Sequence, residues 1–245
     1  MNTTHLLYME TTALVLDNTQ IVEFCTLDNG KSVIVLDSTI FYPQGGGQPY
    51  DQGLIKNNKG GIFEVQEVRF VEGMVHHIGI VQNGIFEKGM IVQCEVNSER
   101  RMLHSLIHSG GHVVDIGLYN LGFKLTPSKG YHFPDGPYIE YCETMDNEDD
   151  RHQLKERLQK EVNDLISASY PVHIKLVERT VLEDMAKYIP ANIPVNKPLR
   201  AMIINSFPAI PCGGTHVEST GQFKAVTIES IKNVKGKLRI RYSVA

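Results

Sequence analysis

Three histidines recur at every fourth position of one segment, and this spacing is the first sign of metal chemistry in the sequence. They are His104, His108 and His112. On an α-helix, residues four apart lie one turn apart on the same face, which allows two imidazoles to bind one metal ion. His104 and His112 would be separated by two turns, about 12 Å, which is too far for both to bind the same ion. At most one adjacent pair can therefore be a ligand pair.

A second pair of possible ligands follows about a hundred residues later, in the segment PCGGTH. Cys212 and His216 are again four apart, but Gly213 and Gly214 disfavour a helix, so we expect a turn that binds metal. Two imidazoles from a helix, with one thiolate and one imidazole from a turn, suit tetrahedral zinc. A histidine pair alone is more often exposed or part of a core. The second pair, with matching spacing, favours a Zn²⁺ site.

A glycine-rich segment, FYPQGGGQP (residues 41–49), is the other unusual feature. Its three successive glycines expose backbone N–H groups and permit the close approach of a ligand. The segment lacks the Lys-Ser/Thr of a phosphate-binding loop and the spacing of a dinucleotide fingerprint. Phe41 and Tyr42, with two glutamines, offer stacking and amide contacts. A flexible hairpin tip is the alternative, but we expect residues 45–48 to border the zinc cleft.

The composition bounds the class of protein. The chain has 245 residues, of which 42% are hydrophobic and 21% charged, an ordinary balance for a soluble protein of one large or two modest domains. No apolar run approaches the roughly 18–20 residues that span a bilayer. The N-terminus lacks a basic region and carries Glu10, so we expect no secretory signal and a cytoplasmic location. Four scattered cysteines fit free thiols in a reducing compartment.

The formal net charge of −4 argues against a general nucleic-acid coat protein. An RNA substrate remains compatible with it, because a local basic face is enough to meet phosphates. A candidate face near the C-terminus comprises Lys232, Lys235, Lys237, Arg239 and Arg241. A solvated strand with ordinary surface charge explains the same residues equally well.

The elements that must position these residues differ between two regions. Residues 1–96 contain short β-rich runs at 21–27, 32–36, 62–70, 74–80 and 90–96, separated by glycine-bearing turns. The Asn29-Gly30 pair between the first two runs is typical of a type I′ hairpin. Several short strands at close spacing predict a small β-barrel domain.

Residues 97–245 mix helices and strands. A helix capped by Asn97 or Ser98 is expected to run to about Tyr119 and to carry the histidines, and a second is expected over 148–169, before Pro171. Strand-like runs follow at 138–141, 173–176, 201–204, 226–231 and 238–244. The expected fold class is therefore α+β, with a barrel over 1–96 followed by an α+β zinc-binding domain over 97–245.

Four separated motifs resemble a known family. They are FYPQGGGQPYDQG (41–53), HSGGHVV (108–114), TPSKGYHFPDGPYIEY (126–141) and PCGGTHV (211–217). Together, and in this order, they resemble the freestanding alanyl-tRNA editing proteins called AlaX, relatives of the editing domain of alanyl-tRNA synthetase. The resemblance covers essentially the whole chain and is closest to the medium-length form, in which a barrel precedes the editing domain.

The resemblance implies a role for each candidate residue. It implies that zinc is bound by His108, His112, Cys212 and His216. It leaves His104 outside the ligand set, where it could touch substrate or orient a ligand. It implies that Thr126 recognises the hydroxyl of a mischarged serine. It also associates the glycine-rich loop, with Gly46, Gly47 and Gln48, with the editing site.

The implied function is trans-editing, the hydrolysis of mischarged tRNA(Ala) to maintain translational fidelity. The family hydrolyses Ser-tRNA(Ala), and some members also act on Gly-tRNA(Ala). We expect tRNA as the partner and no membrane, and we make no prediction of an oligomeric state. No ATP site of an adenylation domain is recognisable, so an editor is expected rather than a ligase. The alternatives are an RNA-binding protein with a structural zinc and a zinc amidohydrolase that acts on a small molecule.

Overall fold

The structure is a computed structural model that describes residues 3–190 and 198–245, so the first two residues of the predicted barrel region lie outside it. The chain divides into two compact units. The first comprises residues 1–45 and 49–102, and the second comprises Gly46–Gln48 and Leu103–Ala245. The tip of the glycine-rich loop thus belongs to the second unit, and each unit is described by itself.

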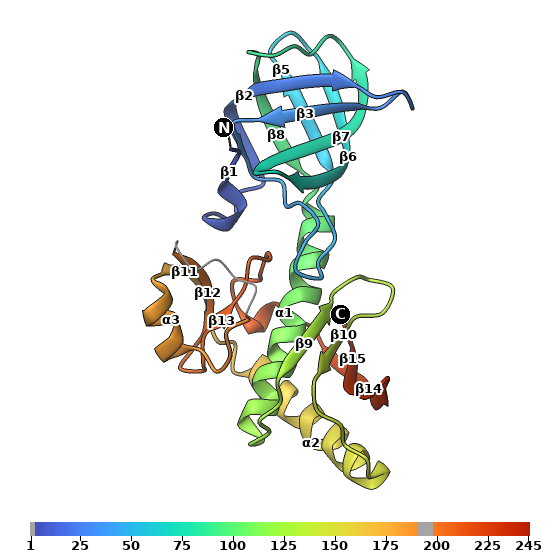
Figure 1. The fold of residues 1–245 in the computed structure, drawn as a ribbon, viewed down its shortest axis with the longest axis vertical. Coiled ribbons are helices and arrows are strands. Elements are labelled where there is room, and N and C mark those ends of the chain that lie inside the picture. The colour runs from blue at the N-terminus through green and yellow to red at the C-terminus, as the bar shows by residue number, and fades with distance from the viewer. Residues whose placement is uncertain (1–2, 191–197) are drawn as a thin grey trace. The chain divides into compact units, whose positions relative to one another are not determined.

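The first unit is a closed, six-stranded antiparallel barrel (Figure 1). In spatial order its strands are β2 (Val15–Thr26), β3 (Ser32–Leu36), β7 (Met74–Asn83), β6 (Ile62–Val71), β5 (Gly53–Asn57) and β8 (Ile91–Val96). The interior is filled by alternating side chains such as Ile34, Leu36 and Phe63, all fully buried. Two short strands, β1 (His5–Leu6) and β4 (Ser38–Thr39), pair in parallel, and the 3₁₀ turn η1 (Leu7–Met9) follows β1. The predicted small barrel is confirmed.

The predicted turn between β2 and β3 is wrong in type. A type I′ turn needs positive φ at both central residues, but only Gly30 has it, at 78°. The Gly30 N–H donates to the Leu27 carbonyl over 3.1 Å, and the Leu27 N–H donates to the Lys31 carbonyl over 2.7 Å. This is a three-residue loop, in which a type I turn is followed by a left-handed glycine, so the extra residue Asp28 removes the need for a mirror-image turn.

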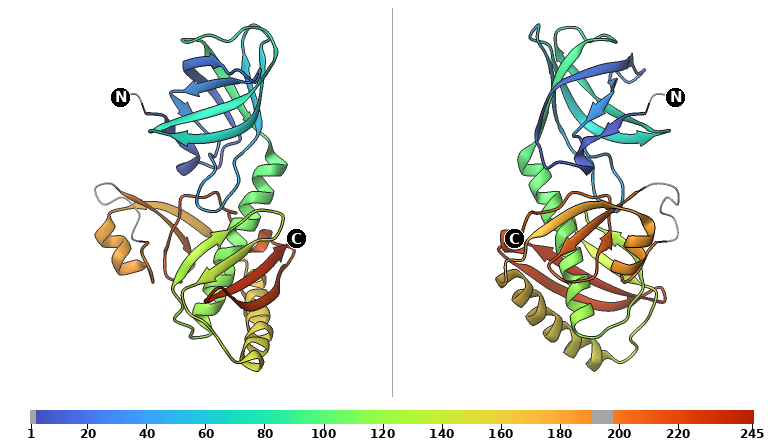
Figure 2. Two further views of the ribbon diagram at one scale, coloured as in Figure 1. Left: turned by 45° about the vertical axis from the view of Figure 1, so that its right-hand side comes forward. Right: turned by 90° about the vertical axis from the view of Figure 1, so that its left-hand side faces the viewer.

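The second unit is built on two long helices and a four-stranded sheet (Figure 2). The sheet order is β14 (Val226–Val234), β15 (Lys237–Val244), β10 (Tyr138–Tyr141) and β9 (Pro127–Tyr131). Helix α1 (Ser98–Asn120) supplies Val113 and Val114 to the core, and α2 (Glu148–Ser167) supplies Leu158 and Val162. These side chains pack with the inner face of the sheet, so the sheet has one core-facing side and one free side.

A smaller antiparallel sheet completes the second unit. It consists of β11 (Val172–Val177), β12 (Leu199–Ile204) and β13 (Ile210–Pro211), with α3 (Arg179–Met185) beside it. A separate small apolar cluster that includes Leu182 and Ala201 holds α3 against this sheet. The 3₁₀ turn η2 (Thr220–Gln222) precedes β14. The α+β class is confirmed, and within the described ranges no helix has the length and apolar character needed to cross a membrane.

Candidate metal centre

Two histidines of α1 and one cysteine of the β13–η2 segment form a cluster that could hold a metal ion. The Cys212 Sγ lies 3.3 Å from the His108 Nε2 and 3.4 Å from the His112 Nε2. All three possible ligand atoms lie within 4.8 Å of one another. Tetrahedral zinc, with bonds of about 2.3 Å to sulfur and 2.0–2.1 Å to nitrogen, places such atoms roughly 3.5 Å apart. The spacing of this cluster therefore fits one zinc ion.

His216 lies beside the cluster without belonging to the three-residue group. Its ring centroid is 5.0 Å from that of His108 and 5.3 Å from that of His112. Its Nδ1 is 3.2 Å from the Ser109 Oγ, whereas its Nε2 is buried with no hydrogen-bond partner among the described residues. A buried polar atom left without a partner is costly. A metal ion held together with the neighbouring ligands would supply the missing partner.

The protonation states suit metal binding. Burial lowers the pKa of His112 to about 3, and burial with neighbouring imidazoles lowers the pKa of His108 and His216 well below the usual value. All three rings are thus neutral near pH 7, as a metal ligand must be. Burial raises the pKa of Cys212, although the Gly214 N–H and Arg200 oppose that effect. A bound cation would favour the thiolate.

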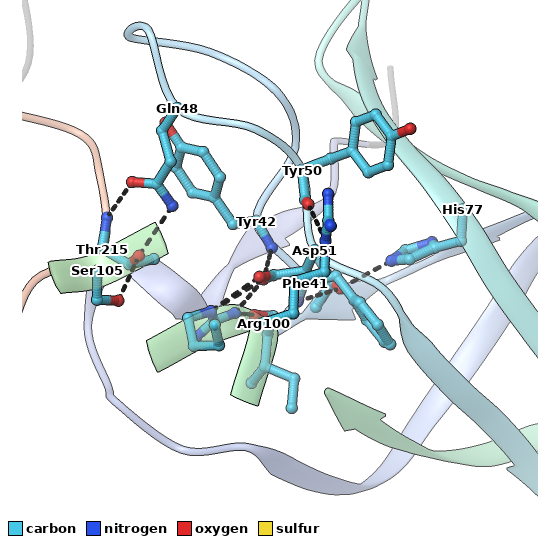
Figure 3. A network of polar contacts seen from close by, with 12 residues as sticks. Phe41, Tyr42, Gln48, Tyr50, Asp51, His77, Arg100, Ser105 and Thr215 are labelled. Atoms are coloured by element: carbon cyan, nitrogen blue, oxygen red, sulfur yellow. Dashed lines mark hydrogen bonds and ion pairs between the residues drawn. The ribbon is translucent and has the colours of Figure 1, made fainter. Parts of the chain in front are cut away.

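Gln48 fixes the orientation of His108 through a hydrogen bond. Figure 3 shows the same side chain bonded to Thr215, next to Ser105. The Gln48 Oε1 accepts hydrogen bonds from the His108 Nδ1–H over 2.7 Å and from the Thr215 N–H over 3.0 Å. Its amide nitrogen donates to the Thr215 Oγ1 over 2.8 Å, and that oxygen also accepts from the Ser105 hydroxyl. The proton of His108 is therefore on Nδ1, and the lone pair of Nε2 points to Cys212. Such an outer partner orients a ligand and raises its basicity.

Two glycines allow the backbone to approach these rings. A Cβ on Gly214 would lie 2.2 Å from the His108 Cε1, so any side chain there would displace the imidazole. Gly47 has a φ of 78°, and a Cβ there would lie 2.3 Å from the Gly130 carbonyl oxygen. The Gly47 carbonyl accepts the His132 N–H over 2.8 Å. Glycine is needed at both positions because of close packing, and at Gly47 also because of its left-handed backbone.

The cluster lies at the wall of a pocket of about 700 Å³ in the second unit. The lining includes Gly46 and Gly47, residues 127–130 of β9, and residues 208–214. Asp115, which lines the same pocket, accepts a hydrogen bond from the Tyr141 hydroxyl over 2.8 Å, and burial raises its pKa. A volume of this size is typical of a site for a small molecule or for one end of a larger one.

Two predicted residues lie outside this arrangement. His104 is buried one turn before His108, but it belongs neither to the cluster nor to the residues that line the pocket. Thr126 is likewise absent from the pocket lining, although its neighbours Leu125 and Pro127 are present. The Thr126 N–H donates to the Glu143 Oε2 over 2.9 Å, and the Thr126 side chain also hydrogen-bonds Glu143.

One residue of the site was given no role from the sequence, although it lies within the motif of residues 126–141. His132 follows β9, and its ring stacks on that of His108 at 4.4 Å with an interplanar angle of 15°. The Tyr242 hydroxyl donates to the Ile107 carbonyl, so its 2.7 Å contact with the His132 Nδ1 must be donated by the imidazole. His132 therefore presents an unprotonated Nε2, and burial lowers its pKa to about 4. A single histidine without spaced partners gave no reason to predict this.

Two protein families match the two ends of the chain, and individual relatives match most of its length. Residues 2–100 match the family described as tRNA synthetases class II (A). Residues 200–241, which include Cys212 and His216, match the second additional domain of threonyl and alanyl tRNA synthetases. The alanyl-tRNA editing protein AlaX-M of Methanosarcina barkeri is 32% identical over 217 residues, which cover 83% of this chain and 84% of that protein. The chain belongs to the AlaX family.

Longer AlaX relatives and synthetases share the same region. The alanyl-tRNA editing protein AlaX-L of Pyrococcus horikoshii is 31% identical over 86% of this chain and 50% of its own length. The alanine–tRNA ligase of Methanopyrus kandleri is 28% identical over 88% of this chain and 23% of its own length. The chain thus spans about half of the AlaX-L protein and about a quarter of the ligase.

Proposed function

We propose that this member of the AlaX family is a trans-editing hydrolase that deacylates mischarged tRNA(Ala) in the cytoplasm. Ser-tRNA(Ala) is the expected substrate, and Gly-tRNA(Ala) is the second one to test. The observation that carries the proposal is the cluster of His108, His112 and Cys212 at a pocket of about 700 Å³. Beside it lies the His216 Nε2, which has no hydrogen-bond partner in the part of the chain that the structure describes.

The proposed metal is Zn²⁺, held by His108, His112, Cys212 and His216. The donor set of three imidazoles and one thiolate, their neutral rings and the 3.3–3.4 Å sulfur-to-nitrogen separations support this choice. When bound, zinc supplies a positive charge that can polarise an ester carbonyl or fix the position of the substrate. Because four protein ligands complete a tetrahedron, other groups of the pocket must orient the water and the ester.

His132 and Asp115 are the pocket groups that suit this task. The His132 Nε2 is held unprotonated by the bond to Tyr242, so it can accept a hydrogen bond from the attacking water and orient its oxygen. Asp115 is an acidic residue that lines the pocket, and its carboxylate complements the α-ammonium of an aminoacyl ester. Gly46 and Gly47 leave backbone exposed at the rim, where the terminal ribose of the substrate would enter.

Discrimination between serine and alanine requires a group that recognises the serine hydroxyl. A site that hydrogen-bonds a substrate hydroxyl disfavours an analogue that lacks it, so correctly charged Ala-tRNA(Ala) would be spared. We propose Thr126 for this role on the strength of the family resemblance. Its side chain would have to exchange its bond to Glu143 for one to the substrate.

The test is a deacylation assay on Ser-, Gly- and Ala-tRNA(Ala) with protein of measured zinc content. We expect Ser-tRNA(Ala) to be hydrolysed at least about tenfold faster than Ala-tRNA(Ala), the ratio that one hydrogen bond supplies. The chelator-treated protein should lose this activity. If the zinc-loaded protein binds tRNA and hydrolyses none of the three, it is a binding protein with a structural zinc. If it hydrolyses free amino-acid amides without tRNA, it is an amidohydrolase.

A further inference from the structure

The sheet β14-β15-β10-β9 has a free face, opposite its core, that shares only Lys129 with the described lining of the pocket. Leu238 and Ile240 of β15 are buried in the core, so the alternating residues Arg239 and Arg241 project from the other side. The register places partners from all four strands on that side. We call this surface the outer face, and its residues are Lys129, Tyr131, Tyr138, Lys232, Lys237, Arg239 and Arg241, with Phe133 just beyond β9.

Aromatic rings on the outer face form a continuous stack. Tyr131 lies between Phe133, at 4.7 Å and 18°, and Tyr138, at 5.1 Å and 16°. The Arg239 guanidinium lies 4.2 Å from the centre of the Tyr138 ring. Cross-strand stabilisation accounts for the Tyr131–Tyr138 pair, but it does not account for Phe133, which lies outside the strand. Partly exposed rings beside a guanidinium are the platform on which unpaired nucleobases stack.

The outer face is also strongly basic. Its five cations outnumber the neighbouring carboxylates, which are Glu140, paired with Arg239, and Asp135 and Glu229, which border the adjoining hollow. Within residues 3–190 and 198–245, Lys129, Lys232 and Arg241 make no ion pair. Since the chain as a whole has a net charge of −4, this concentration of positive charge is local. Unneutralised cations beside stacked aromatic rings complement a strand that carries both phosphates and bases.

Three of these cations line one hollow on the same side of the sheet. Its volume is about 590 Å³, and Lys232, Arg239 and Arg241 line it together with Asp135 and Glu229. Gly136 borders the hollow, and a Cβ there would lie 2.3 Å from the Arg241 Nη2, so this glycine leaves room for the guanidinium. The guanidinium is thereby placed where a phosphate could reach it.

Strand β9 connects the outer face to the pocket. Residues 127–130 line the pocket, while Lys129 and Tyr131 of the same strand belong to the outer face. A polynucleotide whose terminal ester lies in the pocket would therefore cross β9 as it leaves. Four strands at about 4.8 Å spacing give it a path roughly 14 Å wide across the sheet.

We propose that the outer face binds the acceptor end of the tRNA, with unpaired bases stacked on Phe133 and Tyr131 and phosphates paired with Lys232 and Arg241. This proposal rests on the proposed function, because it requires the aminoacyl ester of that tRNA to lie in the pocket. It assigns a surface for the body of the substrate.

The test is the binding of an uncharged RNA minihelix, which ends in the single-stranded acceptor terminus, measured by fluorescence anisotropy. We expect K232A/R241A to weaken binding at least about tenfold at roughly 0.1 M salt, and to reduce the slope of log affinity against log salt by about 1.4–1.8. K232R/R241K should retain most of the affinity. K175A/K224A removes two exposed lysines of the same unit that lie outside the outer face, and should bind as the wild type does.

The aromatic stack and the pocket are tested separately. Y131A/F133A should weaken minihelix binding about tenfold without changing the salt slope, because stacking involves no phosphate. Hydrolysis of 3′-O-seryl-adenosine, which has no RNA body, should be the same in K232A/R241A as in the wild type. Circular dichroism checks that each variant is folded.

The outcomes separate the two proposals. If K232A/R241A binds the minihelix as tightly as the wild type, or no more weakly than K175A/K224A, the outer face is not the RNA site and the proposal is wrong. A protein partner would then be the occupant to seek. If the wild type hydrolyses neither seryl ester while K232A/R241A still loses minihelix binding, the proposed hydrolysis is wrong and the RNA surface stands.

Discussion

One side-chain amide determines how His108 can act as a ligand. Gln48 accepts the His108 Nδ1–H and so leaves the Nε2 lone pair free for a metal. We predict that Gln48→Ala lowers zinc affinity about ten- to a hundredfold, the usual cost of removing an outer partner of a ligand. Competition with a chromophoric chelator measures the affinity directly.

A matched control for Gln48 lies in the same loop. The Gln44 side chain is exposed, and the residue donates a backbone hydrogen bond to the Val68 carbonyl that does not depend on the side chain. Gln44→Ala should therefore retain wild-type zinc affinity. Equal affinities in Gln48→Ala and the wild type would show that His108 needs no outer partner, or that it does not bind the metal.

Thr126 has two competing roles that one pair of substitutions separates. If its hydroxyl recognises serine, Thr126→Val should reduce the ratio of Ser- to Ala-tRNA(Ala) hydrolysis about ten- to a hundredfold, because a hydrogen bond is lost and the shape is kept. If the side chain only anchors Glu143, Thr126→Val and Glu143→Gln should both alter stability slightly and leave the ratio unchanged. Deacylation of both substrates, measured side by side for the two variants, decides between them.

Sequence spacing predicts which residues lie near one another better than it predicts what each one does. The four-residue period of α1 places His108 beside His112, and the structure adds Cys212 in contact with both. His132 could not be predicted, because it reaches the cluster only through the path of β9 and the bond to Tyr242. Thr126 was assigned by resemblance alone, and nothing in its local sequence indicates the bond to Glu143.

The turn that carries Cys212 is an element whose shape depends on one glycine. A Cβ on Gly214 would lie 2.2 Å from the His108 Cε1, whereas a Cβ on Gly213 would meet nothing within 4 Å. We predict that Gly214→Ala displaces His108 and lowers zinc content and deacylation at least about tenfold, as expected when a close contact forces a ligand to move. Gly213→Ala should keep both near wild type.

Metal analysis of the two purified glycine variants, followed by the deacylation assay, provides the measurement. Full zinc occupancy in Gly214→Ala would mean that the turn can relax away from α1, and that the close approach seen here is not required for metal binding.

Regular elements were predicted where their periodicity is strong. Both long helices and most barrel strands lie within a few residues of expectation, and β3 and β10 match it in full. Helix α3 was missed, as were strands β5 and β9 and the two-residue strands β1, β4 and β13. Pro127 and Gly130 make β9 a poor strand by composition, and it exists because it pairs with β10 at the edge of the sheet. Context of this kind cannot be read from a local segment.

At the scale of the whole molecule, the buried imidazoles make stability depend on pH. Burial lowers the pKa of His112 to about 3 and that of His132 to about 4 in the folded chain, whereas an unfolded histidine titrates near about 6.5. Between these values the unfolded state binds more protons, so the free energy of unfolding falls as the pH falls below about 6.5. Burial raises the pKa of Asp115, so this residue makes the folded chain more stable as the pH falls. It is a single group, whereas at least two histidines have the opposite effect.

We therefore predict that the chelator-treated protein melts roughly 5–10 °C lower at about pH 5.5 than at about pH 7.5. His132→Gln, which removes one of the buried rings, should show a smaller difference between the two conditions. Differential scanning calorimetry gives both melting temperatures, and an unchanged value for the wild type would mean that these rings are protonated or exposed in the folded chain.

The hydrogen bond between Gln48 and His108 has a consequence for how the protein matures. The bond joins the loop tip Gly46–Gln48 to His108, a proposed ligand of the metal. Order in the tip and binding of the metal are therefore coupled. If an ordered tip raises the metal affinity by a given factor, the bound metal favours the ordered tip by the same factor. Hydrogen–deuterium exchange should thus show slower exchange of these backbone amides once zinc is added, and Gln48→Ala should abolish the difference. Gly46 and Gly47 also form part of the pocket wall. In a chain without the metal, this part of the wall would be less ordered. Zinc loading would then serve as an assembly checkpoint that precedes any encounter with the substrate.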